Sequence, residues 1–216
     1  NMATMLSYLV TDAEIDHSKL QEMLKKAVDS SFNRISIDTD TSTSDMVVLM
    51  ANGMAGRVNE DEFEKNLTGL CQDLSKDLVR DGEGVTKLIE LKISGADSPQ
   101  MAQKIGKSII NSPLIKTAVH GADPNWGRFV MAVGKVFEHP VRFEELEISF
   151  GSGKKMQAVN SQLLKEEAVK LESISELLQK DTIPIEVVVG HGDHSETFWG
   201  CDLSKGYIDE NAFYTT

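Results

Sequence analysis

The stretch Leu88-Ile89-Glu90-Leu91-Lys92-Ile93-Ser94 alternates between two kinds of side chain. Every second position from Ile89 to Ile93 is a branched aliphatic residue, while Glu90 and Lys92 lie on the opposite face. This period of two is typical of a β-strand with one buried face. The next segment, 98–112, predicts a helix, because Pro99 lies near its start and Pro113 lies just beyond its end.

The same succession of strand and helix extends in both directions along the chain. On the N-terminal side the patterns predict a buried strand, a helix, a half-buried strand, a second apolar strand and a long helix, at 4–11, 17–31, 32–38, 46–51 and 59–80. On the C-terminal side they predict strands at 114–120, 147–150 and 183–190, a charged helix at 161–180, an element at 129–137 that fits helix or strand, and a polar ending through residue 216. This alternation favours a mixed α/β fold over an all-α or all-β fold.

Composition limits the classes of protein. With 216 residues, 40% of them hydrophobic, the chain can bury a sizeable core as one large domain or two small lobes. The net charge of -12 opposes attraction to nucleic-acid phosphates and anionic membranes. Only two cysteines occur, no apolar run approaches the roughly 20 residues of a membrane span, and the start does not resemble a signal peptide. We therefore expect a soluble protein of the reducing cytoplasm.

Two further kinds of site have only weak support. His191 and His194, with Asp193 between them, have a spacing that could hold a metal, but no further ligand cluster accompanies them, so we expect no metal. The run Gly151-Ser152-Gly153 lacks the spacing of a nucleophile elbow and predicts a turn. Cys71 lies on the apolar side of a predicted helix, which favours a core position over a nucleophile.

The glycine-containing segment 81–87 does not have the spacing of a phosphate-binding loop. Its Glu83 would also place a negative charge where phosphate would lie. Two flanking glycines instead permit a tight turn that presents a single carboxylate. Whether Glu83 projects into a cleft or is simply solvated stays open on this pattern alone.

Thr4 is the remaining candidate nucleophile. A threonine hydroxyl reacts only when a base lies beside it, and the amino group of the same residue can serve when that residue is a chain terminus. An α-amine titrates near pH 7.7–8.0, so part of it is neutral at physiological pH. The residues alone give this hypothesis little weight, because threonine at the start of a strand is common.

Six segments in order resemble the ornithine acetyltransferase family over nearly the whole chain. They are Asn1-Met2-Ala3-Thr4-Met5-Leu6, the pair Ser31-Phe32-Asn33-Arg34-Ile35 and Asp40-Thr41-Ser42-Thr43-Ser44-Asp45, Arg80-Asp81-Gly82-Glu83-Gly84-Val85-Thr86-Lys87, Ala122-Asp123-Pro124-Asn125-Trp126-Gly127-Arg128, Trp199-Gly200-Cys201-Asp202-Leu203, and Tyr207 with Asn211-Ala212-Phe213-Tyr214-Thr215-Thr216. Each segment alone is weak, but six in order are specific.

The resemblance implies a precursor that cuts itself into an α chain and a β chain. The cut would fall between Ala3 and Thr4, and Thr4 would become the nucleophile of the β chain. In the implied ping-pong reaction of arginine biosynthesis, an acetyl group passes from N2-acetyl-L-ornithine to Thr4 and then to L-glutamate. No cofactor is implied, although acetyl-CoA serves some members as a co-substrate.

The resemblance also implies the rest of the site and the assembly. Thr4, Glu83, Asn211 and Thr216 would bind the substrate, and the α chain would supply the oxyanion-hole donors, a lysine and a further threonine. The implied fold is an α/β arrangement of stacked β-sheets flanked by helices, the self-cleaving fold with an N-terminal nucleophile. Two α and two β chains would associate, and the β chain would divide into a nucleophile lobe, about 1–140, and a C-terminal lobe, about 141–216.

One departure is that Asn1 to Ala3 still precede Thr4, which suggests a fragment or a processed or trimmed product. The bond is uncut, or these residues belong to an adjoining chain, or the sequence joins pieces that are separate in the protein. Two rival hypotheses therefore remain. One is a catalytically silent, uncut subunit, and the other is a self-cleaving aminopeptidase or amidohydrolase in which water takes the acyl group.

Overall fold

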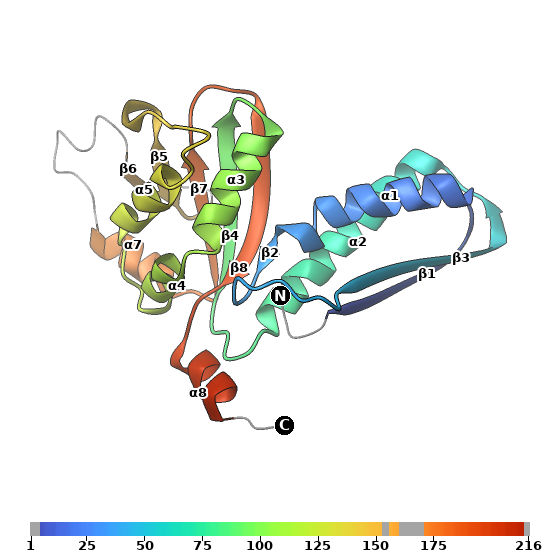
Figure 1. Cartoon of the computed structure of the whole chain (residues 1–216), viewed down its shortest axis with the longest axis horizontal. Coiled ribbons are helices and arrows are strands. Elements are labelled where there is room, and N and C mark those ends of the chain that lie inside the picture. Colours follow the sequence, from blue (N-terminus) through green and yellow to red (C-terminus); the bar gives the residue numbers. More distant parts are fainter. Residues whose placement is uncertain (1–4, 153–155, 160–170, 214–216) are drawn as a thin grey trace.

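The computed structural model describes residues 5–152, 156–159 and 171–213. Within them the chain forms two β-sheets and the helices that cover them (Figure 1). Strands and helices alternate along most of the chain, which confirms the mixed α/β class. No helix in this part of the chain is long and apolar enough to cross a membrane.

The two-stranded layer consists of β1 (Leu6–Glu14) and β3 (Met46–Arg57), which pair in parallel. Helices α1 (His17–Asp29) and α2 (Glu60–Arg80) lie along one face of this sheet (Figure 1). Asn59 begins α2 by accepting a hydrogen bond from the Glu62 amide at 3.1 Å. The core between sheet and helices is formed by Leu9, Met23, Ala27, Phe32, Leu67 and Cys71.

The opposite face of the two-stranded layer is apolar and uncovered among the described residues. Leu6, Tyr8 and Val10 on β1 are 53%, 58% and 73% exposed, and Met50 and Met54 on β3 are also exposed. The strand predicted at 4–11 is present as β1, but the prediction that it is buried was wrong for its outward face. Among the described residues only the other face of β1 is covered, so the apolar run alone could not show how much of the strand is buried.

The six-stranded layer has the strand order β2-β8-β4-β7-β5-β6. Strand β4 pairs in parallel with β7 and antiparallel with β8, at the centre of the sheet. The strands are β2 (Ile35–Ser36), β4 (Leu88–Ala96), β5 (Glu147–Phe150), β6 (Met156–Val159), β7 (Thr182–Val188) and β8 (His194–Cys201).

Within the described ranges, four helices accompany the six-stranded layer and share its main core. They are α3 (Pro99–Ile110), α4 (Pro113–His120), α5 (Trp126–Gly134) and α7 (Leu171–Leu178), with a short 3-10 helix, η2 (Phe143–Glu145), between α5 and β5. A smaller core joins the two layers, because Val79 near the end of α2 packs with Leu88 and Trp199. The helix α8 (Lys205–Phe213) follows β8 and projects below both layers (Figure 1).

The expected strand at 114–120 was wrong, because this segment is helix α4. Pro113 occupies the first turn, where a missing amide hydrogen costs nothing. Ile115, Ala118 and Val119 are buried at helical spacing against the core. The element at 129–137, left open between helix and strand, falls mainly in helix α5.

Other expected boundaries also changed. The segment 32–38 begins as a 3-10 helix, η1 (Phe32–Arg34), and only then forms the short strand β2. Strand β3 continues past residue 51, where the predicted strand ended, and Gly53 within it adopts a φ of +74°. Of the expected helix at 161–180, the part before residue 171 lies outside the described residues, and α7 forms the rest. The polar ending contains both β8 and α8, which the sequence patterns did not predict.

The predicted helices at 17–31, 59–80 and 98–112 and the strands at 88–94, 147–150 and 183–190 are confirmed to within a few residues. The division into lobes near residue 140 stays a prediction. The six-stranded layer takes strands from both sides of that position.

Candidate active site

Glu83 and Asn211 are in direct contact. The Asn211 Nδ2 donates to Glu83 Oε2 at 2.6 Å and also to the Tyr207 carbonyl at 3.0 Å. Glu83 lies in the loop between α2 and β4, and Asn211 lies on α8, 128 positions later. Both side chains are on the surface, so a ligand can reach them. The structure thus brings together two of the expected substrate-binding residues, whose role stays a prediction.

Thr4, Ala3 and Thr216 lie outside the described residues. The next residue along the chain, Met5, donates its amide hydrogen to Asp45 Oδ1 at 2.9 Å. Met5 and Asp45 also line a cavity of about 740 Å³ between α1, the loop that follows β2, and α3.

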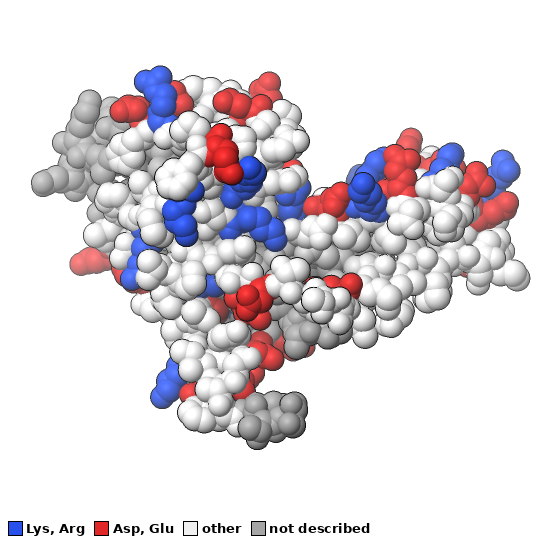
Figure 2. All heavy atoms as spheres, viewed as in Figure 1, with Lys and Arg blue, Asp and Glu red and all other residues white. Residues whose placement is uncertain are grey.

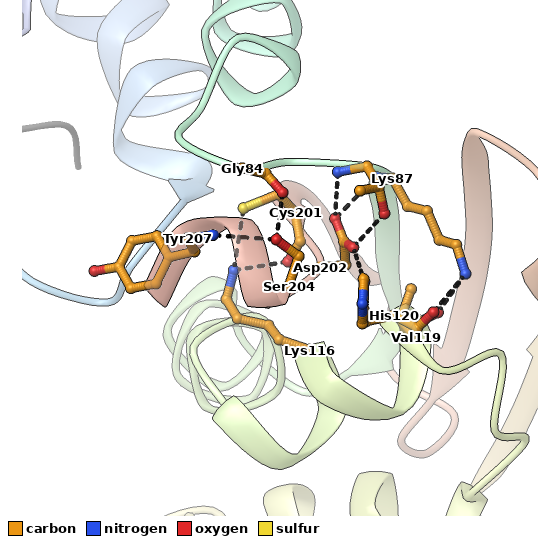
Figure 3. Close-up of polar contacts among 10 residues, drawn as sticks. Gly84, Lys87, Lys116, Val119, His120, Cys201, Asp202, Ser204 and Tyr207 are labelled. Carbon is orange, nitrogen blue, oxygen red and sulfur yellow. Dashed lines mark hydrogen bonds and ion pairs between the residues drawn. The ribbon is translucent and has the colours of Figure 1, made fainter. Parts of the chain in front are cut away.

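A close backbone contact holds the Glu83 loop against the start of α8. The Ser204 hydroxyl donates to the Gly84 carbonyl and accepts from the Tyr207 amide at 3.2 Å (Figure 3). Gly84 has a φ of +62°, and a Cβ on it would lie 2.2 Å from the Tyr207 nitrogen. Glycine is needed here both for its backbone conformation and for the approach of α8.

The Asp202 carboxylate is a buried acceptor between the same two segments. Its Oδ1 accepts from the amides of Thr86 and Lys87 at 2.9 and 2.8 Å, and its Oδ2 accepts from the Thr86 hydroxyl at 2.5 Å and lies 2.7 Å from His120 Nδ1 (Figure 3). Burial alone would raise the pKa of Asp202, but donation from Thr86, His120 and Lys87 outweighs burial and leaves that pKa lowered. Asp202 is therefore held as a carboxylate.

Lys116, on α4, is a second buried charged group beside this network. Its Nζ donates to the carbonyls of Ser36, Ile37 and Cys201 at 3.2, 2.8 and 2.9 Å. Burial is the main cause that lowers the pKa of Lys116. These bonds join the end of β2 to the end of β8, just before Asp202.

Burial and nearby negative charges both affect the acidity of Tyr207. The pKa of Tyr207 is raised first by burial and then by the negative charges of Asp38, Glu83 and Asp40. Figure 2 shows acidic side chains on the face between the two-stranded layer and α8. The local field therefore favours a cationic group beside Glu83.

The other candidates have no comparable surroundings. Cys71 is fully buried, which confirms its predicted core position, and burial raises the pKa of its thiol. Within 5–152, 156–159 and 171–213, no three His, Cys, Asp or Glu side chains are grouped to hold a metal ion.

Asp202 and Lys116 were not predicted from the sequence to have a role. Asp202 lies in one of the six segments that resemble the family, directly after the apolar end of β8. This position was the only feature of the sequence that pointed to it. Lys116 had none, because a single lysine within an apolar helix looks like any exposed lysine.

Comparison with known proteins assigns the chain to a family. The model of the ArgJ family matches residues 1–216. The arginine biosynthesis bifunctional protein ArgJ 2 of Clostridium acetobutylicum is 46% identical over 220 residues, covering 100% of this chain and 54% of that protein. The glutamate N-acetyltransferase Oat2 of Streptomyces clavuligerus is 41% identical over 224 residues, covering 100% of this chain and 55% of that protein.

A solved structure agrees with the fold. The crystal structure of the arginine biosynthesis bifunctional protein argJ from Bacillus halodurans superimposes with a TM-score of 0.86 at 38% identity, covering 97% of this chain and 100% of that chain. This confirms the expected stacked-sheet fold of proteins with an N-terminal nucleophile. The chain spans about half the length of the curated relatives it matches. The chain belongs to the ArgJ family.

Proposed function

We propose that this chain is the β half of a glutamate N-acetyltransferase that moves an acetyl group from N2-acetyl-L-ornithine to L-glutamate in arginine biosynthesis. Its relatives carry that activity or that pathway in their names. The observation that supports it most directly is the contact between Glu83 and Asn211 beside further carboxylates. A negatively charged, exposed pair suits a substrate that carries a side-chain ammonium or an amino-acid head group.

Each side chain has a chemical task in this proposal. The Glu83 carboxylate accepts hydrogen bonds from the ammonium of ornithine. The Asn211 amide has both a donor and an acceptor, so it can bind either end of an amino-acid head group. Thr216 would complete the site with its hydroxyl.

The reaction proceeds in two half-reactions at Thr4. Its Oγ attacks the acetyl carbonyl, its proton passes to the α-amine of Thr4, and the C–N bond breaks so that ornithine leaves with that proton. The amine of glutamate then attacks the threonine ester, the C–O bond breaks, and the hydroxyl of Thr4 is restored. Neither half-reaction requires a cofactor, and acetyl-CoA would be an alternative acetyl donor in the first.

The α half of the precursor is the proposed partner. The uncovered apolar face of β1 and β3, with Tyr8, Val10 and Met54 on it, is larger than isolated surface side chains would explain. The curated relatives are about twice as long as this chain, so another half is available to cover that face. We propose that two such αβ pairs assemble in the cytoplasm and that the α half supplies the oxyanion-hole donors.

Substitution of Thr4 in the full-length precursor tests the proposal. Thr4→Ala should abolish both cleavage and acetyl transfer, whereas Thr4→Ser should retain part of each, because serine keeps the hydroxyl and the terminal amine. Mass spectrometry reports cleavage, and ornithine and acetylglutamate are measured in the same samples. Full transfer by Thr4→Ala would refute the assignment.

The same experiment separates the rival hypotheses. An intact Ala3–Thr4 bond in an inactive protein would support the silent subunit. Release of ornithine that does not rise with added glutamate would support a hydrolase, because water would then be the acceptor.

A further inference from the structure

We propose that Asp202 is a positioning residue for substrate binding, which fixes the loop carrying Glu83 against the segment carrying Asn211. This inference rests on the proposed function. Asp202 does not touch Glu83 or Asn211, and it acts through the backbone of Thr86 and Lys87.

Three successive links join the two segments. The Asp202 carboxylate binds Thr86 and Lys87, the Ser204 hydroxyl binds the Gly84 carbonyl, and Asn211 binds Glu83. The side chain of Asp202 is 0% exposed, whereas Asn211 and Glu83 form their bond at the surface. The Asp202 carboxylate is therefore better shielded from competing water than the bond between Glu83 and Asn211.

The geometry favours a carboxylate at this position. Two backbone amides donate to Oδ1, and the Thr86 hydroxyl donates to Oδ2. Since an ionised carboxylate has no hydrogen to give, the His120 Nδ1 at 2.7 Å must carry the proton and donate as well. An asparagine can keep its Oδ1 toward the two amides, but its NH2 group must then donate to the Thr86 hydroxyl and to an unprotonated His120 Nδ1. All four contacts then become neutral hydrogen bonds, which are weaker than those of a carboxylate.

Helix α4 is tied into the same arrangement. The Lys87 Nζ donates to the carbonyls of Val119 and His120 at 2.7 and 3.0 Å, at the end of that helix (Figure 3). The loop is thus fixed from two sides, by Asp202 and by α4. A small shift of Thr86 would move Glu83, three residues before it, relative to Asn211.

The test compares kinetic constants of the full-length, two-chain protein with N-acetylornithine as the acetyl donor. Asp202→Asn should raise the KM by about tenfold or more while kcat changes by less than about threefold, because Thr4 is not displaced. Thr86→Val removes only one donor to the carboxylate and should raise the KM in the same direction by less. This second variant decides the matter if Asp202→Asn does not fold.

Ser108→Ala is the matched control. It removes a partly buried hydrogen bond, from Ser108 to the Ala132 carbonyl at 2.6 Å, in the same layer but away from both segments. Its KM should stay at the wild-type value. If Asp202 only stabilised the fold, the variants would instead lose kcat through a smaller active fraction and keep the KM.

A double-mutant cycle tests whether Asp202 acts through Glu83. In a Glu83→Gln background, Asp202→Asn should change the KM by less than about twofold, because the group being positioned has already lost its charge. Fully additive effects, or an unchanged KM for both Asp202→Asn and Thr86→Val in an active protein, would overturn the inference alone. Failure of the wild-type protein to use N-acetylornithine would overturn the proposed function and this inference with it.

Discussion

Replacement of the buried Lys116 by methionine should destabilise the protein through three carbonyl groups. The ammonium is enclosed and donates to Ser36, Ile37 and Cys201 at 2.8–3.2 Å. Methionine fills a similar volume and keeps the apolar contacts of the lysine stem, so the substitution removes mainly the hydrogen bonds.

The expected loss follows from the number of acceptors. A buried carbonyl deprived of its donor costs about 1 kcal/mol or somewhat more, so three of them cost about 3 kcal/mol. Methionine also removes the free-energy cost of burying the ammonium, which opposes this loss of stability. The net loss should therefore be at the lower end of the range for variants that break a buried charged contact. Lys107→Met is the matched control, because the Lys107 Nζ donates to only one carbonyl, that of Ile35 at 3.1 Å, and its loss should be about 1 kcal/mol.

The loss should also depend on pH. Since burial lowers the pKa of Lys116 below its ordinary 10.5, the unfolded chain binds the proton more tightly than the folded chain. The contribution of Lys116 to the free energy of unfolding of the wild-type protein therefore rises with pH between the lowered pKa and 10.5. The difference in stability between wild type and Lys116→Met should widen over that window, because methionine does not titrate.

Urea unfolding of the two-chain protein measures these differences. Protein concentration is held constant, since association contributes to the apparent stability. Circular dichroism and the fluorescence of Trp199, which lies in the core that joins the two layers, report the transition. Equal losses of unfolding free energy for Lys116→Met and Lys107→Met would refute the reasoning. A Lys116→Met variant as stable as wild type would refute it too, because the cost of burying the ammonium would then cancel the stabilisation from its hydrogen bonds.

Three further substitutions test the site. Glu83→Gln keeps the shape but removes the charge, so the KM for N-acetylornithine should rise about tenfold at an unchanged melting temperature; unchanged kinetics would remove Glu83 from the site. Gly84→Ala should cost about 1–3 kcal/mol in thermal unfolding, because the new Cβ would meet the Tyr207 nitrogen and the backbone φ is positive. Gly121→Ala, whose Cβ would find its nearest neighbour at 3.6 Å, is the control, and equal losses would contradict the steric argument. Because the pKa of Asp202 is lowered from 3.8, its stabilisation is present above that value and is lost as the pH falls through the folded-state pKa. The stability gap between wild type and Asp202→Asn should accordingly narrow in acid, and a constant gap would contradict the ionised assignment.

The local sequence pattern was sufficient to predict a helix or strand where that element buries one regular face. Helix α2 and strand β4 were both predicted, because their apolar side chains recur with the period of the element. Helix α4 was mistaken for a strand because its apolar residues are nearly continuous, although Pro113 at its start was a usable helix signal.

Other elements depend on distant neighbours that no local pattern reveals. Strand β8 begins with polar residues and contains Gly200, whose missing side chain lets Ile110 approach to 2.6 Å from the Cβ position. Helix α8 buries no residue and has no apolar periodicity to detect. The outward face of β1 is not covered by any other part of the chain that the structure describes, so its exposure could not be inferred from the apolar run.

The candidate site shows the same limit. Family resemblance implied that Glu83 and Asn211 both bind the substrate, but their direct contact was not predicted, since residues so far apart share no local signal. Asp202 and Lys116 were missed because their importance lies in the groups that surround them after folding. A buried charge is recognised by its partners, and the partners are set by the tertiary structure.

The sequence separation across the Glu83 loop has a consequence for biosynthesis. The links at Thr86, Gly84 and Glu83 reach forward 116, 120 and 128 positions, respectively. Contacts of such long range close late, and during translation their second members emerge from the ribosome last. The central sheet is subject to the same limit, because Leu88 of β4 pairs with Cys201 of β8. A nascent chain can therefore complete neither the centre of that sheet nor the contact between Glu83 and Asn211 until most of its residues have been synthesised.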